Sequence, residues 1–516
     1  MTAYERITRA GVELDAARMK LPLHAETCYG PLLDRAVKKI AELEAGSLAN
    51  FDEGRQVGHN WLRDPQQAPV EHRQAIVDSW QQIEAVRAQF VQGGFAQLAW
   101  VGIGGSAMAP QLLYDALAST SSTPMHFFDN TDPAGFQRVL EQLDAGAGLA
   151  KTMVVVVSKS GGTKETRSGM RVLQQEFQRR QIAWEPNAVA ITQPGSALDR
   201  QASEWLNRLP IWDWVGGRTS LFSAVGMLPA AICGLGMHEL LEGAKEMDAA
   251  TRVSGLRENP ALMLAMLWYH AVEVEGRRNM VILPYCDRLL LLSKYLQQLV
   301  MESLGKDGKG ISVFGNKGST DQHSFVQQLR EGYADFFGTF ICVRKPAADW
   351  IVDSAAAANP ASGARERLEV SVGDYLAAFQ EGTAQALREA GRPSLRLTVD
   401  ELTPHTLGAI IALYERAVGF YAELIGVNAY HQPGVEAGKK AAEQVLDAQS
   451  AVVLALRSSA DGATVGELAK QTGVPVELTH DILHRLQVCG RCGVQHIAET
   501  KTPASLADCR FASVEG

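Results

Sequence analysis

The sequence contains few cysteines, and they form no dense framework. Seven are spread over 516 residues, a sparse and odd set that excludes a disulfide-rich scaffold and fits a reducing compartment. Cys489 and Cys492, with His484, His496 and Cys509, could be drawn as a zinc site, but a single CxxC pair without a second at standard spacing is a poor signal. We therefore expect no metal and no other cofactor.

Long apolar runs are also missing. The most apolar stretch, AVGMLPAAICGLGM at 224–237, contains a proline and falls short of the roughly 18 apolar residues that suggest a membrane span. We expect a buried helix there. The first residues, MTAYERITRAGVELDAARMK, alternate charge with apolar positions and lack the uninterrupted apolar core of a secretory signal. These absences predict a cytoplasmic protein without membrane attachment.

The sequence has no excess of positive charge. Its 49 Lys and Arg residues stand against 58 Asp and Glu, a formal net charge of −9. The surface as a whole therefore repels nucleic acid and anionic membranes, and an anionic ligand needs a local pocket. With 46% hydrophobic and 21% charged residues, the composition is that of a globular protein of about three domains.

Short apolar runs separated by helix-length segments dominate the chain. They lie at 98–103, 125–128, 153–157, 188–192, 279–285, 310–315 and 336–345. Such runs are typical of parallel sheets covered on both faces. We expect an α/β protein with two doubly wound parallel-sheet domains, at 96–245 and 246–447. Residues 1–95 show no strong strand signal and predict an N-terminal helical segment.

Residues 448–516 have a different sequence pattern from the rest of the chain. Helical segments flank the turn TGVP, in the manner of a helix-turn-helix or winged-helix module. This segment contains six basic and seven acidic residues, so we expect it to lack the basic surface that DNA binding requires. We expect a small helical extension and no nucleic-acid partner.

The loop after the first apolar run carries Gly104, Gly105 and Ser106 directly before a helix. A glycine-rich strand-to-helix turn directs free backbone N–H groups at one point and forms an anion site. The same turn is equally typical of tight packing. Both interpretations stay open on the sequence.

The loop after the third run strengthens the case for phosphate. Ser158, Lys159, Ser160 and Thr163 place three hydroxyls and one cation at a turn that enters a helix. Both loops follow strands of one open sheet, at the edge where such folds bind ligands. Neither loop is a Walker motif or a dinucleotide fingerprint, so nucleotide use is not indicated.

Further along, charged groups accumulate beside apolar segments. Arg218 follows two glycines, which could let a ligand approach closely or form a plain turn. Gln298, Glu302 and Lys306 recur every four residues and are expected on one face of a helix at 288–306. A helical Glu is usually solvated, but this one ends a largely apolar helix and is a candidate base.

Two polar loops supply the remaining candidates. His323 lies in NKGSTDQHSF, where a capping or surface histidine is the plain alternative. Gln432, Glu436 and Lys439 lie in YHQPGVEAGKK between a helix end and a further helix, where a solvated loop would also explain them.

Taken together, these segments resemble the phosphoglucose isomerase family over most of residues 50–445. Four ordered parts carry the resemblance: GIGGS at 102–106, SKSGGTKET at 158–166, GGRTSLFSAVG at 216–226 with MESLGK at 301–306, and YHQPGVEAGKK at 430–440. The resemblance implies an aldose–ketose isomerase that interconverts glucose 6-phosphate and fructose 6-phosphate through an enediol. It also implies two sugar-isomerase-type domains and a homodimer.

The resemblance further assigns roles. Arg218 would stabilise the enediolate and Glu302 would be the isomerising base. Ring opening would use Lys439 and His323, the latter contributed by the partner subunit. The remaining assignments are substrate contacts: the phosphate-holding Gly105, Ser106, Ser158, Lys159, Ser160 and Thr163, the positioning Gln298 and the lining Gln432.

Elementary chemistry supports the same roles. Aldose–ketose isomerisation needs one base on the face of an enediol, an acid or base at the ring oxygen, and a cation for the developing oxyanion. The candidates include all three kinds of group, and the reaction requires no metal or redox cofactor.

The sequence departs from the family pattern at three positions. Thr219 replaces the usual aromatic residue, Leu304 the usual Asn and Pro433 the usual Trp. None of them removes an assigned catalytic group, but they bear on pocket shape, so a dual phosphoglucose and phosphomannose isomerase stays an alternative. A non-catalytic sugar-phosphate sensor with a DNA-binding tail is the alternative from another class.

Overall fold

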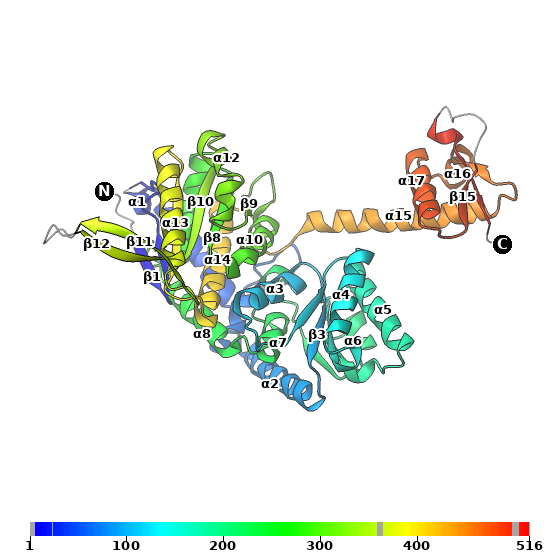
Figure 1. Ribbon diagram of the computed structural model, residues 1–516, viewed down its shortest axis with the longest axis horizontal. Helices are drawn as coiled ribbons and strands as arrows, with labels where there is room; N and C mark the ends of the chain where they lie inside the picture. Colours follow the sequence, from blue (N-terminus) through cyan, green and yellow to red (C-terminus); the bar gives the residue numbers. More distant parts are fainter. Residues whose placement is uncertain (1–5, 23, 359–364, 498–504, 515–516) are drawn as a thin grey trace. The chain divides into compact units, whose positions relative to one another are not determined.

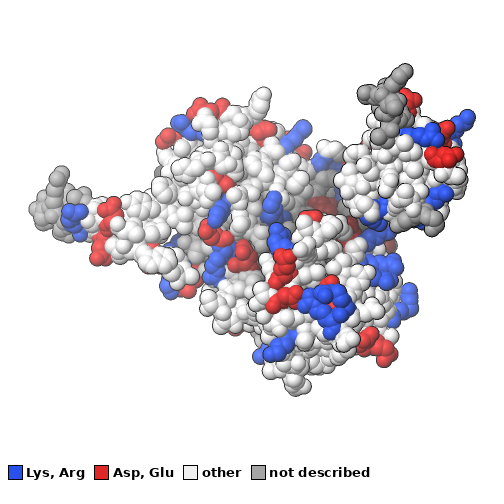
Figure 2. All heavy atoms as spheres, turned by 45° about the vertical axis from the view of Figure 1, so that its right-hand side comes forward, with Lys and Arg blue, Asp and Glu red and all other residues white. Residues whose placement is uncertain are grey.

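The computed structural model describes residues 6–22, 24–358, 365–497 and 505–514. The chain divides into two compact units, Met1–His431 and Gln432–Gly516. Figure 1 shows the first unit as two α/β lobes and the second as a long helix that leads into a small helical module. On the face drawn in Figure 2, acidic and basic side chains are interspersed.

The first sheet has five parallel strands in the order β4-β3-β5-β6-β7. They are β3 (Gln97–Val101), β4 (Met125–Phe128), β5 (Thr152–Val157), β6 (Ala188–Thr192) and β7 (Asn207–Pro210). All six residues of β5 are buried, because consecutive side chains enter two different cores: Val155 and Val157 on one face, Val154 and Val156 on the other. The predicted doubly wound sheet is confirmed.

Helices cover both faces of this sheet and follow its strands in turn. They are α3 (Gly105–Leu117), α4 (Pro133–Ala145), α5 (Lys164–Arg179), α6 (Ala197–Gln201) and α7 (Ala224–Ile232). The expected buried helix at 224–237 is confirmed as α7, eight of whose nine residues are buried. It ends early because Gly234 and Gly236 adopt left-handed φ angles of 69° and 74°.

The second sheet has six strands in the order β1-β2-β13-β10-β8-β9. They are β1 (Arg6–Arg9), β2 (Val12–Asp15), β8 (Asn279–Tyr285), β9 (Ser312–Gly315), β10 (Phe336–Val343) and β13 (Ser394–Val399). The pairings β13-β10, β10-β8 and β8-β9 are parallel, as expected. A second hairpin, β11 (Ile351–Ala358) and β12 (Arg365–Ser371), projects from this lobe (Figure 1).

The prediction of a helical segment over residues 1–95, without strong strand signal, did not include two strands that the structure shows at residues 6–15. Residues 6–15 form an antiparallel hairpin whose second strand pairs with β13, with Leu14 opposite Leu397. Ala10 and Gly11 make its turn with positive φ angles. The strands are four residues long and half charged, so the local pattern is weak, and pairing with the edge of a distant strand decides the conformation. The rest of the segment is helical, in α1 (Ala25–Glu44) and α2 (Val70–Gln92).

A buried helix, α14 (Pro404–Ile425), packs at the centre of the first unit against α8 (Met237–Ala250) and α9 (Pro260–Tyr269). The predicted start is confirmed: Thr403 caps the helix through the Thr406 N–H, and Pro404 occupies the first turn, where it loses no hydrogen bond. The helices that complete this unit are α10 (Leu290–Leu296), α11 (Glu302–Leu304), α12 (Val326–Glu331) and α13 (Val372–Glu389).

The second unit contains a winged-helix-like arrangement. Its elements are α15 (Pro433–Arg457), β14 (Ala463–Thr464), α16 (Val465–Thr472), α17 (Val476–Val488), β15 (Val494–His496) and β16 (Arg510–Ser513), with the strands in the order β14-β16-β15. Its own core includes Val452, Leu468, Leu483 and Phe511. Helix α15 runs through the predicted domain boundary at 447/448, and the domain divisions stay predictions.

Candidate active site

Two loops meet the expectation that polar groups gather at the carboxyl edge of the first sheet. The loop after β3 leads into α3, and the loop after β5 leads into α5. The chain order reverses between these two adjacent strands, since β4 lies on one side of β3 and β5, β6 and β7 lie on the other. This reversal is the place where open α/β sheets bind ligands.

The first loop is fitted tightly against the segment that carries Arg218. A Cβ added to Gly105 would lie 2.0 Å from the Gly217 carbonyl oxygen, so only glycine fits there. Gly104 has a φ of 60°, and a Cβ on it would lie 3.1 Å from Gln298 Nε2. Ser106 follows in the first turn of α3 and is half-buried. The packing interpretation of the glycines therefore holds, and this packing brings the loop beside two candidate substrate contacts.

The second loop is organised by its own hydroxyls. Ser158 Oγ donates to Thr163 Oγ1 at 3.3 Å and accepts from the Gly161 N–H at 3.1 Å. Ser160 Oγ accepts from the Gly162 N–H at 3.2 Å. Thr163 precedes the first residue of α5, and its side chain makes no capping bond, so its hydroxyl, which accepts from Ser158 Oγ, lies at a positive helix end.

Lys159 points away from the hydroxyls of its loop. Its Nζ donates to the carbonyl oxygens of Asp213 and Val215 at 2.7 and 3.0 Å. Burial, with the nearby Arg55 guanidinium, lowers the pKa of Lys159 to about 8. In this arrangement the ammonium ties the second loop to the segment before Arg218.

Arg218 and Glu302 form the centre of the site. The Arg218 side chain is 4% exposed and its Nη1 lies 3.3 Å from Glu302 Oε1. Arg218 Nε donates to Ser303 Oγ at 2.7 Å. Gln298 Nε2 donates to Glu302 Oε2 at 3.1 Å. The carboxylate, 23% exposed, thus has one oxygen near a cation and the other near an amide.

The helix that carries the candidate base is irregular. A π-helical segment, Gln297–Met301, separates α10 from α11, and Lys306 lies beyond the last helical residue, Leu304. The expected four-residue spacing still joins Gln298 to Glu302. It does not extend to Lys306, because the helix ends before that residue. Wide turns of this kind are frequent at functional sites.

Four consecutive backbone carbonyls, from Asn428 to His431, accept hydrogen bonds from side chains. Lys306 Nζ donates to the Asn428 oxygen at 2.6 Å, and Asn50 Nδ2 donates to the Tyr430 oxygen at 3.2 Å. Arg218 Nη2 donates to the oxygens of Ala429 and His431. These partial negative charges lie against two cations and hold the guanidinium in place.

Burial shapes the electrostatics of these groups. It lowers the pKa of Arg218, an effect that Glu302 partly offsets. Burial and the Arg218 charge lower the pKa of Lys306 to about 8. His59, 4% exposed, lies at a cavity of ≈ 20 Å³ that Arg218 also lines. Burial holds the pKa of His59 well below its usual value, with Arg63 adding to the effect, so this imidazole is neutral.

Three predicted site residues stay predictions: one is exposed in the first unit and two belong to the second unit. His323 ends a 3₁₀ turn, Thr320–His323, and is exposed. Within the described part of the chain, no hydrogen bond or ion pair links His323 to Glu302 or Arg218. Gln432 begins the second unit. Lys439 lies within α15, and its side chain is outside the described residues.

Sequence reasoning missed Ser303, Asn50 and His59. A serine inside the base motif was a readable signal, since it is a small polar residue at the end of an apolar helix. The positions of Asn50 and His59 carry no such signal, because their contacts with Tyr430 join segments far apart in the chain. Among the described residues, no group of three or more His, Cys, Asp or Glu could hold a metal ion, and no described helix is long and apolar enough to span a membrane.

Known proteins of one family match the chain over nearly its whole length. The phosphoglucose isomerase family profile matches residues 32–466. The glucose-6-phosphate isomerase of Thermosynechococcus vestitus is 47% identical, covering 96% of this chain and 94% of the relative. That of Geotalea daltonii is 45% identical, covering 97% and 96%.

Solved structures agree with these relatives. A glucose-6-phosphate isomerase from Chlamydia trachomatis is similar with a TM-score of 0.77 at 26% identity, covering 86% of this chain and 90% of that one. A hypothetical protein from Thermus thermophilus is similar with a TM-score of 0.71 at 29% identity, covering 84% and 99%.

Proposed function

The chain belongs to the phosphoglucose isomerase family, and we propose that its site interconverts glucose 6-phosphate and fructose 6-phosphate by proton transfer through an enediol, a reaction of glycolysis and gluconeogenesis. One observation carries the proposal: one oxygen of the Glu302 carboxylate lies beside the Arg218 guanidinium and the other accepts from the Gln298 amide, and the glycine loop after β3 packs against Gln298 and Gly217. A base, a cation and a positioning amide therefore converge where the sheet topology favours a ligand.

Each group has a defined step. Glu302 removes the proton from the carbon next to the carbonyl carbon and, once the enediol has formed, returns it to the former carbonyl carbon, while a proton passes between the two neighbouring oxygens. Arg218 stabilises the negative charge that develops on the enediolate oxygen, and its rigid hydrogen bonds mean that little reorganisation accompanies the reaction. Gln298 orients the carboxylate and the substrate.

The phosphate is held at the two loops. Ser158, Ser160 and Thr163 offer hydroxyls, as does Ser106, and Gly105 brings its backbone N–H at the start of α3. Lys159 contributes positive charge to the same edge, although its ammonium donates to the Asp213 and Val215 carbonyls. The phosphate lies far from the reacting carbons, so these contacts serve binding more than turnover.

Ring opening needs an acid or base at the ring oxygen, a role separate from those of Glu302 and Arg218. We assign it to Lys439 and to His323 of a second copy, with Gln432 lining the site, in a cytoplasmic homodimer. The exposure of His323 is what such an arrangement requires. Mixing inactive Glu302→Gln and His323→Ala subunits should restore activity through hybrids with one intact site. Confirmed subunit exchange without restored activity would contradict the assignment.

The direct test of function is a coupled assay. Purified protein given fructose 6-phosphate should form glucose 6-phosphate and little mannose 6-phosphate, read by separate coupling enzymes. Comparable formation of both would favour the dual isomerase, and no isomerisation would favour the sugar-phosphate sensor. The relatives named glucose-6-phosphate isomerase favour neither alternative.

A further inference from the structure

A cavity of ≈ 340 Å³ opens on the second sheet and shares no lining residue with the candidate active site. It lies between the carboxyl ends of β8, β10 and β13 and the first turns of α13. Tyr285, Cys342 and Thr398 form one row across these three strands, because Cys342 pairs with both of the others. This volume lies in the range of small-molecule sites.

The position of this cavity matches that of the phosphate loops in the first sheet. In the second sheet, β9 lies on one side of β8, and β10 and β13 lie on the other, which repeats the order of β4, β3, β5 and β6. The chain order therefore reverses between β8 and β10, the place where open sheets bind ligands. Arg344 and Pro346, directly after β10, line the cavity.

The second sheet does not reproduce a phosphate site. The Gly373 N–H of α13 donates to Asp349 Oδ1 at 2.9 Å, and the Asp374 N–H donates to Ser371 Oγ at 3.0 Å. The helix N–H groups that would bind an anion are thus occupied by the protein's own oxygens. The carboxylates of Asp349 and Asp374 also line the cavity and repel an anion.

Two buried donors at the cavity lack partners. Gln380 is 7% exposed, and its Nε2 makes no hydrogen bond within the described residues. The same holds for Nε of Arg396, whose terminal nitrogens pair with Asp15 and Glu381 at 3.2 Å. Unpaired buried donors are costly, and a ligand oxygen would satisfy them. Burial raises the pKa of the Cys342 thiol to about 12, so it too is a neutral donor.

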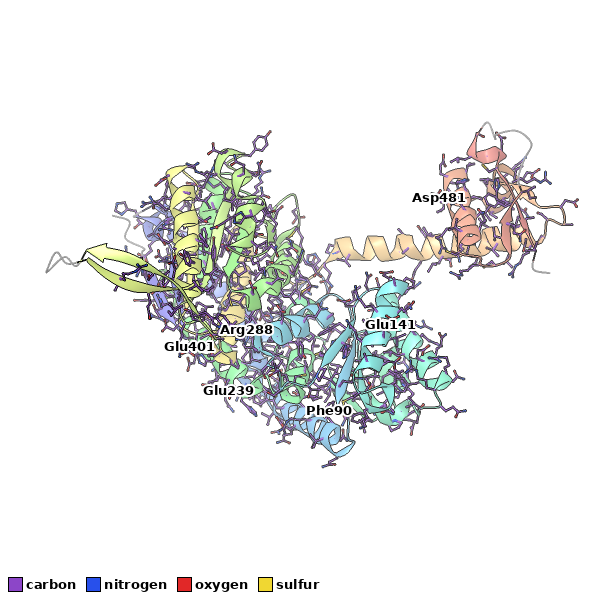
Figure 3. The ribbon with its side chains drawn as sticks, viewed as in Figure 1. Phe90, Glu141, Glu239, Arg288, Glu401 and Asp481 are labelled. Atoms are coloured by element: carbon purple, nitrogen blue, oxygen red, sulfur yellow. The ribbon has the colours of Figure 1, made fainter. Side chains whose placement is uncertain are left out.

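The cations around the cavity are already paired. Arg344 lies 3.1 Å from Glu13 and 2.8 Å from Asp400, and beyond the strand ends Lys345 pairs with Glu401, labelled in Figure 3, at 2.6 Å. No cation in the lining is left to balance a phosphate. Hydroxyl groups, which donate and accept, match both the unpaired donors and the two carboxylates.

We propose that this cavity binds an uncharged polyhydroxylated molecule, such as an unphosphorylated sugar alcohol, at a second site separate from the isomerase centre. The inference does not rest on the isomerase activity, since no residue of the cavity takes part in that reaction.

D-glucitol is a suitable probe because it has neither a phosphate nor a carbonyl to isomerise. Saturation-transfer NMR on the full chain should show saturable D-glucitol binding. Glu302→Gln protein with saturating fructose 6-phosphate should bind it equally, because the substrate site is then filled without turnover. The double variant Gln380→Leu, Thr398→Val should bind it about tenfold more weakly, by loss of hydrogen bonds at the same shape.

Ala377→Leu is a second variant, on an exposed position of α13 that lines the cavity. It narrows the space without disturbing the core and should also weaken D-glucitol binding. Unchanged fructose 6-phosphate isomerisation by both variants would show that they fold. The proposal is overturned by the absence of saturable binding, by equal binding in wild type and variants, or by displacement of D-glucitol with fructose 6-phosphate.

Discussion

Arg218 Nε donates to Ser303 Oγ at 2.7 Å, while Nη1 of the same guanidinium lies 3.3 Å from Glu302 Oε1. The residue after the base therefore holds the cation that faces the base. Since Glu302 and Ser303 share one helical turn, a shift of that turn would move both groups together. The distance between proton acceptor and oxyanion stabiliser is thus set by local geometry.

Replacement of Glu302 by Gln should remove turnover but retain binding. The change keeps size and removes the basic oxygen, so kcat should fall by roughly 10² to 10⁴ or more. Wild-type enzyme in deuterated water should incorporate label at C2 of glucose 6-phosphate, because a carboxyl proton exchanges with solvent before it returns. Substantial label from Glu302→Gln would place the base elsewhere, with His323 the next residue to test.

Replacement of Ser303 by Ala should lower kcat more than it changes KM. Without the hydroxyl, Arg218 Nε loses a buried acceptor and the guanidinium is less well oriented, which should cost about tenfold in kcat. Ser293→Ala is the matched control, since that buried hydroxyl donates only to the Leu290 carbonyl of its own helix. Equal kinetics for the two variants would mean that Ser303 does not orient the cation.

Replacement of Thr163 by Ala should act on substrate binding. Its hydroxyl lies beside Ser158 at the phosphate loop, far from the reacting carbons, so KM should rise more than kcat falls. Ser168→Ala, on the exposed face of α5 with a bond to Lys164 O, should have no effect. A collapsed kcat at unchanged KM would contradict the phosphate assignment.

The alkaline limb of the pH profile should report a buried lysine. Burial lowers the pKa of Lys306 to about 8, with Arg218 adding to the effect, and the neutral amine holds the Asn428 carbonyl less firmly. Activity should fall as pH rises through about 8. Lys306→Arg, which stays charged, should move this limb to higher pH. Burial also lowers the pKa of Lys159 to about 8. If only Lys159→Arg moves the alkaline limb, the limb reports Lys159 at the phosphate loop and not Lys306.

The same lysine predicts a stability trend. At pH values between the native pKa of Lys306, about 8, and its ordinary pKa of 10.5, this side chain binds fewer protons in the native state than in the unfolded state. The contribution of Lys306 to the free energy of unfolding should therefore rise with pH across this window. Denaturant unfolding of wild type and Lys306→Met at pH 8 and pH 10 measures the difference. A difference that does not change with pH would contradict the buried setting of this lysine.

Arg63 should be critical for folding stability. It is fully buried, lies 2.6 Å from Asp248 and pairs with Glu415, which in turn accepts from Tyr295 OH at 3.0 Å. Arg63→Met leaves two carboxylates without a cation and should lower the free energy of unfolding by about 3–5 kcal/mol. Lys38→Met, which removes an exposed pair with Glu42, should change it by about 0.5 kcal/mol or less. Similar losses in both variants would contradict the role of burial.

The parallel strands, the central helix and the polar loops after the strands follow from local sequence patterns. The run TMVVVV in β5 does not alternate between apolar and polar residues, which indicates a strand buried on both faces. Thr403 followed by Pro404 marks the start of a helix locally. The polar loops were predicted from their places after strand runs, and Gln298 and Glu302 from their helical spacing, whereas the role of Arg218 came from the resemblance to the family.

Tertiary structure decided what local patterns leave open. The hairpin at residues 6–15 forms because β13 offers it an edge, and Lys159 turns toward the Asp213 and Val215 carbonyls because burial makes their oxygens its available partners. Arg218 is held by backbone oxygens more than two hundred residues away. Such contacts depend on carbonyl groups that every residue type possesses, so no sequence pattern distinguishes them, and only the packed chain selects which oxygens meet the cation.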